Sequence, residues 1–76
     1  MNTIKKRSIN IAGHTTSVSL EEEFWQELVV MASDKNISVN RLVTDIDALR
    51  ISETNLSSAI RLYILNDLKL KLLATQ

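Results

Sequence analysis

Polar and apolar residues alternate with a period of two over residues 14–20, which is the pattern of a strand with one buried face. Thr16, Val18 and Leu20 share one face of this predicted strand. The opposite, polar face carries Thr15, Ser17 and Ser19. We therefore expect Val18 and Leu20 to be buried.

The residues before this strand have the opposite phase. Ile9 and Ile11 would place the apolar side of a continuous strand on the other face, so the phase would change at Gly13. A bulge or a turn at this glycine would restore it. We treat residues 5–12 as an arm and residues 14–20 as the strand.

After Leu20 the apolar period becomes that of a helix, and three helices are predicted at about 21–34, 39–50 and 56–73. Ser38 can cap the second helix after a break around Asn36, and Asn55 or Ser57 can cap the third. A polar link is expected at residues 51–54. The fold class is therefore mainly α with one short strand.

The third helix is apolar on more than one side. Its first apolar face is formed by Leu56, Ala59, Ile60, Tyr63 and Ile64, whereas Leu62, Leu65, Leu72 and Leu73 point elsewhere. Such a helix is normally buried on more than one side. We expect it to enlarge a dimer interface, and it offers a surface that could join dimers into a tetramer.

A single strand exposes unpaired backbone groups on both edges, so it needs a partner strand. With 76 residues, the chain is also marginal as a monomer. It has no cysteine and one histidine, which excludes a disulfide and argues against a structural metal site. An obligate homodimer that pairs two strands antiparallel is the expected solution.

The formal net charge is zero, but the charges are segregated along the chain. Lys5, Lys6 and Arg7 precede every acidic residue, and an acidic stretch follows from Glu21 to Asp34. The basic segment is either a solvated tail or an electrostatic contact to a partner. Net neutrality alone argues against nucleic acid, and it predicts modest affinity at physiological salt.

Several function classes find no support in the sequence. The first eleven residues lack an apolar signal core and no apolar run is long enough for a transmembrane span, so we expect a cytoplasmic protein with no membrane partner. The only histidine, His14, is far along the chain from Ser57 and Ser58, so no hydrolytic nucleophile is indicated. We expect no enzyme, no metal, no cofactor and no small-molecule ligand.

The stretch TSVSLEEEFWQELVVMASDKNISVNRLV resembles the ribbon-helix-helix DNA-binding fold of the Arc and MetJ repressors. KRSINIAGHTTSVSLEEEFW, IDALR and NLSSAIRLYIL together resemble short bacterial ribbon-helix-helix proteins that carry an additional C-terminal helix. This resemblance implies a basic arm at 1–13, a ribbon-helix-helix core at 14–50 and an additional helix at 55–76. It also implies an intertwined dimer with an intermolecular two-stranded ribbon.

The resemblance implies that the paired ribbon enters the major groove of duplex DNA. Thr15, Ser17 and Ser19 would then read base edges. Phosphates would be bound by the arm and by the start of the second helix, that is by Lys5, Lys6, Arg7, His14, Ser38, Val39 and Asn40. Because short hydroxyls can bond to several bases, discrimination between sequences is expected to be weak.

Two functions remain open at this point. The first is a repressor-like transcription regulator that binds double-stranded DNA as a homodimer or a higher oligomer. The second is a protein–protein interaction module, such as an antitoxin-like adaptor, that uses the C-terminal helix to bind its partner. A DNA binder should bind generic duplex in a salt-sensitive way, whereas an adaptor should tolerate loss of the basic arm.

Overall fold

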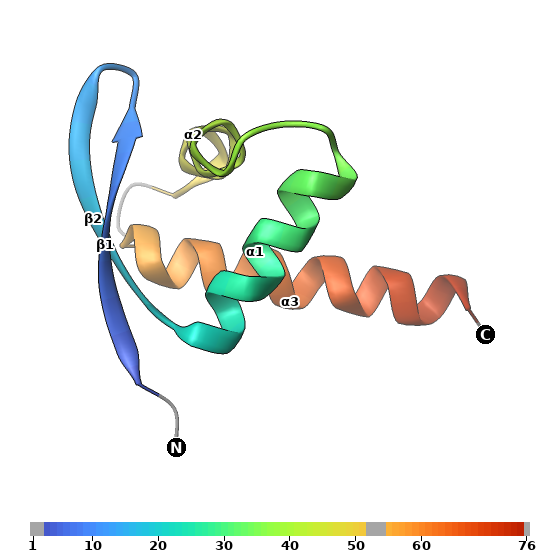
Figure 1. Ribbon diagram of the computed structural model, residues 1–76. Coiled ribbons are helices and arrows are strands. Elements are labelled where there is room, and N and C mark those ends of the chain that lie inside the picture. The colour runs from blue at the N-terminus through green and yellow to red at the C-terminus, as the bar shows by residue number, and fades with distance from the viewer. Residues whose placement is uncertain (1–2, 52–54, 76) are drawn as a thin grey trace.

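The computed structural model describes residues 3–51 and 55–75. Two antiparallel strands, β1 (Ile4–Ile11) and β2 (His14–Glu21), are followed by three helices, α1 (Glu22–Asp34), α2 (Val39–Leu49) and α3 (Leu56–Ala74). The strands form a long hairpin at one side of the molecule, and the three helices lie together on the other side (Figure 1). The expected order of a ribbon, two helices joined by a tight turn, and an additional C-terminal helix is confirmed.

The segment expected to be an arm is a strand. β1 pairs with β2 along its whole length, with Ile9 opposite Thr16 and Arg7 opposite Val18. The expectations of one short strand, and of a strand without a partner in its own chain, were therefore wrong. Both strands of the ribbon come from one chain, so the orphan strand no longer argues for a dimer.

A two-residue turn at Ala12 and Gly13 explains the change of phase. Both residues have positive φ, 50° and 83°, as the hairpin turn of type I′ requires. Because the chain reverses at this turn, Ile9 and Thr16 face the same side although their phases along the sequence differ. The glycine does carry a turn, and that turn joins two strands.

One face of the hairpin closes a single apolar core. Ile9, Val18 and Leu20 are buried with 3%, 0% and 0% of their surface exposed, which confirms the burial expected for Val18 and Leu20. From the helices the core receives Leu28, Met31, Ala32, Leu42, Val43, Ile46, Ile60 and Ile64. The hairpin thus has an inner face on the core and an outer face away from it.

The turn between α1 and α2 follows the sequence-based expectation. Asn36 adopts positive φ at the end of α1, and the Ser38 hydroxyl accepts the N–H of Arg41 at 3.0 Å as the cap of α2. The expected link at 51–54 lies, apart from Ile51, outside the described residues. Asn55 then caps α3 by accepting the N–H of Ser58 at 2.8 Å.

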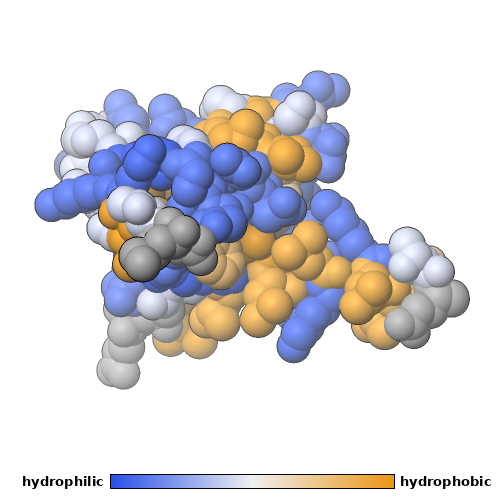
Figure 2. Space-filling view, turned by 60° about the horizontal axis from the view of Figure 1, so that its bottom comes forward, coloured by the Kyte–Doolittle hydropathy of each residue, from blue (hydrophilic) through white to orange (hydrophobic). Residues whose placement is uncertain are grey.

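α3 belongs to the core only in its first half. Ile60 and Ile64 are fully or almost fully buried, whereas Leu65, Leu70 and Leu72 are 48%, 64% and 63% exposed. The C-terminal half of α3 projects beyond the other elements (Figure 1), and Figure 2 shows apolar surface along it. The helix therefore keeps a large apolar surface in contact with solvent.

Candidate nucleic-acid interface

The outer face of the hairpin is built from both strands and is polar apart from Ile4 at one end. Thr15, Ser17 and Ser19 of β2 all lie on this face, on the side opposite the core residues Val18 and Leu20. Thr15 and Ser17 are exposed and Ser19 is half-buried. The structure thus brings the three predicted base-reading residues together on one surface.

β1 supplies the other half of this outer face. The register places Lys6 opposite Ser19, Ser8 opposite Ser17, and Asn10 opposite Thr15. All three β1 residues are exposed. Ser8 and Asn10 were missed by sequence reasoning because the arm was not assigned to a strand. A hairpin turn at Gly13, one of the two options that the phase change left, would have identified both.

The three basic residues of β1 do not form one surface. Lys6 is on the outer face, whereas the Arg7 side chain turns to the inner face, where its guanidinium carbon lies 4.4 Å from the centroid of the Trp25 ring. Arg7 Nη2 also donates to Glu22 Oε1 at 2.9 Å. Arg7 therefore ties β1 to the first turn of α1. Its guanidinium is directed away from the outer face.

Two other hairpin residues that were predicted to contact phosphates, Lys5 and His14, do not lie on the outer face. Lys5 lies on the Arg7 side of β1, where its Nζ is 3.6 Å from Glu22 Oε1 and its side chain is 58% exposed. His14 begins β2 beside the turn, opposite Ile11, and is exposed. Lys5 and His14 are thus accessible but lie on the hairpin's other face.

Two acidic residues at the junction of β2 and α1, Glu21 and Glu22, each form an ion pair with an arginine. Arg61 Nε donates to Glu21 Oε1 at 2.9 Å, and Arg7 makes the equivalent bond to Glu22. A hydrogen bond from a backbone N–H and the bond from Arg61 lower the pKa of Glu21. The bond from Arg7 lowers the pKa of Glu22. These pairs reduce the repulsion that the two carboxylates would exert on a polyanion.

The first turns of α3 cover the outer edge of β2 at Ser19. The Ser19 N–H donates to Ser57 Oγ at 3.0 Å, and Arg61 Nη2 donates to the Ser19 carbonyl oxygen at 3.0 Å. These side chains satisfy backbone groups that a strand edge otherwise leaves open to another strand. They also fix the backbone that carries the Ser19 hydroxyl.

The start of α2 is a separate surface. The Ser38 hydroxyl is occupied by the Arg41 N–H, Val39 is half-buried, and Asn40 is exposed. In Figure 1 the turn that leads into α2 lies at the end of α1 that is away from the hairpin. Within one chain, Ser38, Val39 and Asn40 are therefore not part of the outer face of the hairpin.

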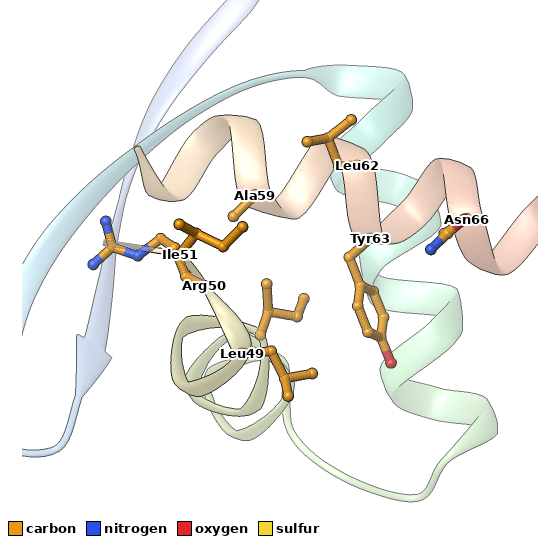
Figure 3. A pocket seen from close by; sticks show the side chains of 8 residues that line it. Leu49, Arg50, Ile51, Ala59, Leu62, Tyr63 and Asn66 are labelled. Carbon is orange, nitrogen blue, oxygen red and sulfur yellow. The ribbon is translucent and has the colours of Figure 1, made fainter. Parts of the chain in front are cut away.

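Two surface hollows flank the helices. One, between the end of α2 and α3, is lined mainly by apolar side chains that include Leu49, Ile51, Leu62 and Tyr63 (Figure 3). The other, between the outer edge of β2 and the start of α3, is lined by polar groups that include Ser17, Ser19, Asn55, Ser58 and Arg61. The first hollow continues the exposed apolar surface of α3, and the second adjoins the polar outer face.

Over residues 3–51 and 55–75, no group of three or more histidine, cysteine, aspartate or glutamate side chains is arranged to hold a metal ion. None of the helices in the same part of the chain has the length and hydropathy that a membrane span requires. The chemistry that this surface offers is hydrogen bonding by hydroxyls and an amide, one ammonium group at Lys6, and the carboxylate of Glu21, which is paired with Arg61.

A family model described as ribbon-helix-helix domain matches residues 4–68, which span both strands, α1, α2 and most of α3. Proteins of that family are generally DNA-binding transcription regulators or antitoxins, the domain is a non-enzymatic DNA-binding fold, and the family typically binds DNA as dimers. Neither the curated proteins nor the solved structures yielded a match.

Proposed function

The chain belongs to the ribbon-helix-helix domain family, and from this premise we propose that it is a cytoplasmic transcription regulator. It binds duplex DNA by placing the outer face of the β1–β2 hairpin in the major groove. The observation that carries the proposal is the composition of that face. Six polar side chains from two paired strands project from it, and its one acidic residue, Glu21, is paired with Arg61.

The dimensions of the hairpin fit this role. The major groove is about 12 Å wide and admits a two-stranded ribbon. Two strands lie roughly 4.8 Å apart, which leaves room for side chains to reach the base edges. The cap on Ser19 supports the same role, because it keeps a further strand from widening the ribbon at that position.

Backbone contacts come from two places in this proposal. Lys5, on the other face of β1, and Lys6, at the edge of the outer face, are both exposed and neutralise phosphates on a generic duplex. At a specific site the Lys6 ammonium faces a base edge instead. The N-terminus of α2 holds a further phosphate with the free N–H groups around Val39 and Asn40. Few phosphates are neutralised by each chain, so binding is modest at physiological salt, and log K falls with log salt concentration with a shallow slope.

In this proposal, assembly of several copies of the chain raises the affinity for DNA. We propose a homodimer in which the exposed apolar surface of α3 packs on that of a second copy, with a tetramer as the larger assembly. A second copy fits because each chain carries both a ridge, at Leu65 and Leu72, and an apolar hollow, at Leu49, Ile51 and Leu62. Several ribbons on one duplex would offset weak readout by avidity.

Sedimentation tests this assembly. Replacing Leu65 and Leu72 by Gln should lower the mass in solution while the fold persists, because neither residue is part of the core. If that variant keeps its oligomeric state, the α3 surface is not a contact between copies. The adaptor function would be favoured instead if a separate protein occupied this surface and DNA binding were absent.

Fluorescence anisotropy with a generic labelled duplex tests DNA binding. The wild-type protein should bind more weakly as salt rises, with log K falling linearly against log salt concentration. Lys6→Ala should weaken binding to every duplex and reduce the slope by about 1. Lys71→Ala, at a lysine whose side chain is 51% exposed and pairs with Asp67 on another side of α3 from Leu65 and Leu72, is the matched control and should change neither. A protein that binds no duplex at low salt would overturn the proposal.

A further inference from the structure

We propose that β1 supplies the base specificity, with Asn10 selecting adenine and Lys6 selecting guanine, so that one chain carries a complete two-stranded reading ribbon. The proposal rests on the proposed function, because it assumes that the outer face of the hairpin meets the major groove. It differs from the sequence-based hypothesis, in which the readers are only the hydroxyls of Thr15, Ser17 and Ser19.

The chemistry of the outer face separates its two strands. The three β2 residues and Ser8 end in hydroxyls, each of which both donates and accepts and so suits several bases. The Asn10 amide presents one donor and one acceptor side by side, which matches N7 and N6 of adenine. The Lys6 ammonium donates only, which matches the two acceptors of guanine, O6 and N7.

Both side chains are available for this contact. Asn10 and Lys6 are exposed, and neither makes a side-chain hydrogen bond or an ion pair within the described part of the chain. The other charged groups of β1 are engaged with α1, since Arg7 and Lys5 both approach Glu22. Selection of bases therefore does not require any existing contact to break.

The backbone that carries these side chains is anchored between them. Lys6, Ser8 and Asn10 alternate along β1 with Arg7 and Ile9, which point inward. Ile9 is buried in the core, and Arg7 is fixed on Trp25 and Glu22. A backbone held in this way does not have to be ordered when DNA binds, which lowers the entropic cost of recognition to that of the side chains alone.

The spacing of the two residues predicts a pattern in the DNA. Lys6 and Asn10 are on the same face and four residues apart, which is about 13 Å at ~3.3 Å per residue. That length corresponds to roughly four base-pair steps of 3.4 Å. The bound site should therefore contain a guanine and an adenine about four base pairs apart, with less selective positions between them.

Selection of bound sequences from a random duplex pool at stated salt tests this proposal, with the wild type, Asn10→Ala and Lys6→Ala. Gln26→Ala, which removes an exposed side-chain amide on α1, is the matched control. Asn10→Ala should lose the preference for adenine at one position, and discrimination there should fall by about 5- to 150-fold in affinity ratio. Binding of unselected duplex by this variant should stay within about twofold of wild type, since an amide neutralises no phosphate.

Lys6→Ala should remove the preference at the guanine position in addition to its effect on all sequences. If the wild type enriches a motif that Asn10→Ala and Lys6→Ala leave unchanged, or binds duplex and enriches no motif, this inference is wrong while the proposed function stands. If the wild type binds no duplex at low salt, both fail. Circular dichroism of each variant shows that a lost preference is not a lost fold.

Discussion

Replacing Ile9 by Ala tests whether β1 is a structural part of the domain. Ile9 is 3% exposed, lies opposite Thr16 in the hairpin, and packs in the same core as Val18 and Leu20. If residues 5–12 were a solvated arm, the change would have almost no effect on stability. Since β1 closes the core, the change should leave a cavity.

The expected size of this effect is large for so small a domain. Replacing a buried isoleucine by alanine costs about 2–5 kcal/mol of unfolding free energy. A chain of 76 residues has roughly 4–11 kcal/mol in total, at ~0.05–0.15 kcal/mol per residue. Ile9→Ala should therefore remove a large fraction of the stability and lower Tm by at least about 8 °C, taking ~4 °C per kcal/mol.

Ile4→Ala is the matched control for this measurement. Ile4 lies on the same strand but is 57% exposed, so its replacement should cost less than about 0.5 kcal/mol. Urea unfolding followed by circular dichroism gives both free energies at fixed protein concentration. Equal, small losses for the two variants would refute the assignment of β1 to the core.

Three further results are expected. Leu28→Asp should prevent folding, because Leu28 is fully buried among apolar side chains and the change buries a charge there, and a cooperative unfolding transition near the wild-type midpoint would contradict this. The lowered pKa of Glu22 stabilises the fold above pH 4.5, the ordinary pKa of this residue, and this stabilisation should be lost as the pH falls below 4.5. In melts at a series of pH values, Tm of Glu22→Gln should therefore fall less steeply with acid than Tm of the wild type. Arg7→Ala should reduce Tm more than Lys6→Ala does, while Lys6→Ala weakens DNA binding more; the reverse order would show that Arg7 serves DNA and not the fold.

The helices and one face of β2 were predictable from sequence because each depends on local patterns. Burial on one side gives apolar residues a spacing of two in a strand, as for Val18 and Leu20, and a spacing of three or four in a helix, as in α1 and α2. The cap at Ser38 follows from hydroxyl chemistry that acts within three residues. Local preference and global fold agree at these positions, so the sequence alone is informative.

The strand β1 was not predicted because the evidence for it lies across a turn. Two-residue turns of type I′ are usually recognised by Asn-Gly or Asp-Gly, and here Ala12 adopts positive φ without that side chain. Ile9 and Ile11 are out of phase with Val18 and Leu20 along a continuous strand, but the reversal of the chain at the turn brings them to the same face. A three-residue run of basic side chains reinforced the interpretation as an arm.

The role of Arg7 also could not be predicted from a count of charges. Its neighbours Trp25 and Glu22 are 18 and 15 residues away in the chain, and only the hairpin brings them together. The same holds for Ser57 and Arg61, which reach Ser19 from 38 and 42 residues away. Such contacts depend on tertiary structure, and no local pattern indicates them.

The most direct test of the central claim is an NMR titration of the labelled protein with a short duplex selected from the random pool. At 8.6 kDa the chain is well suited to amide shift mapping. The largest shifts should fall on Lys6, Ser8, Asn10, Thr15 and Ser17 of the outer face, with small shifts over the C-terminal half of α3. Shifts confined to α3, or no shifts at a low salt concentration, would contradict the claim that the outer face of the hairpin binds DNA.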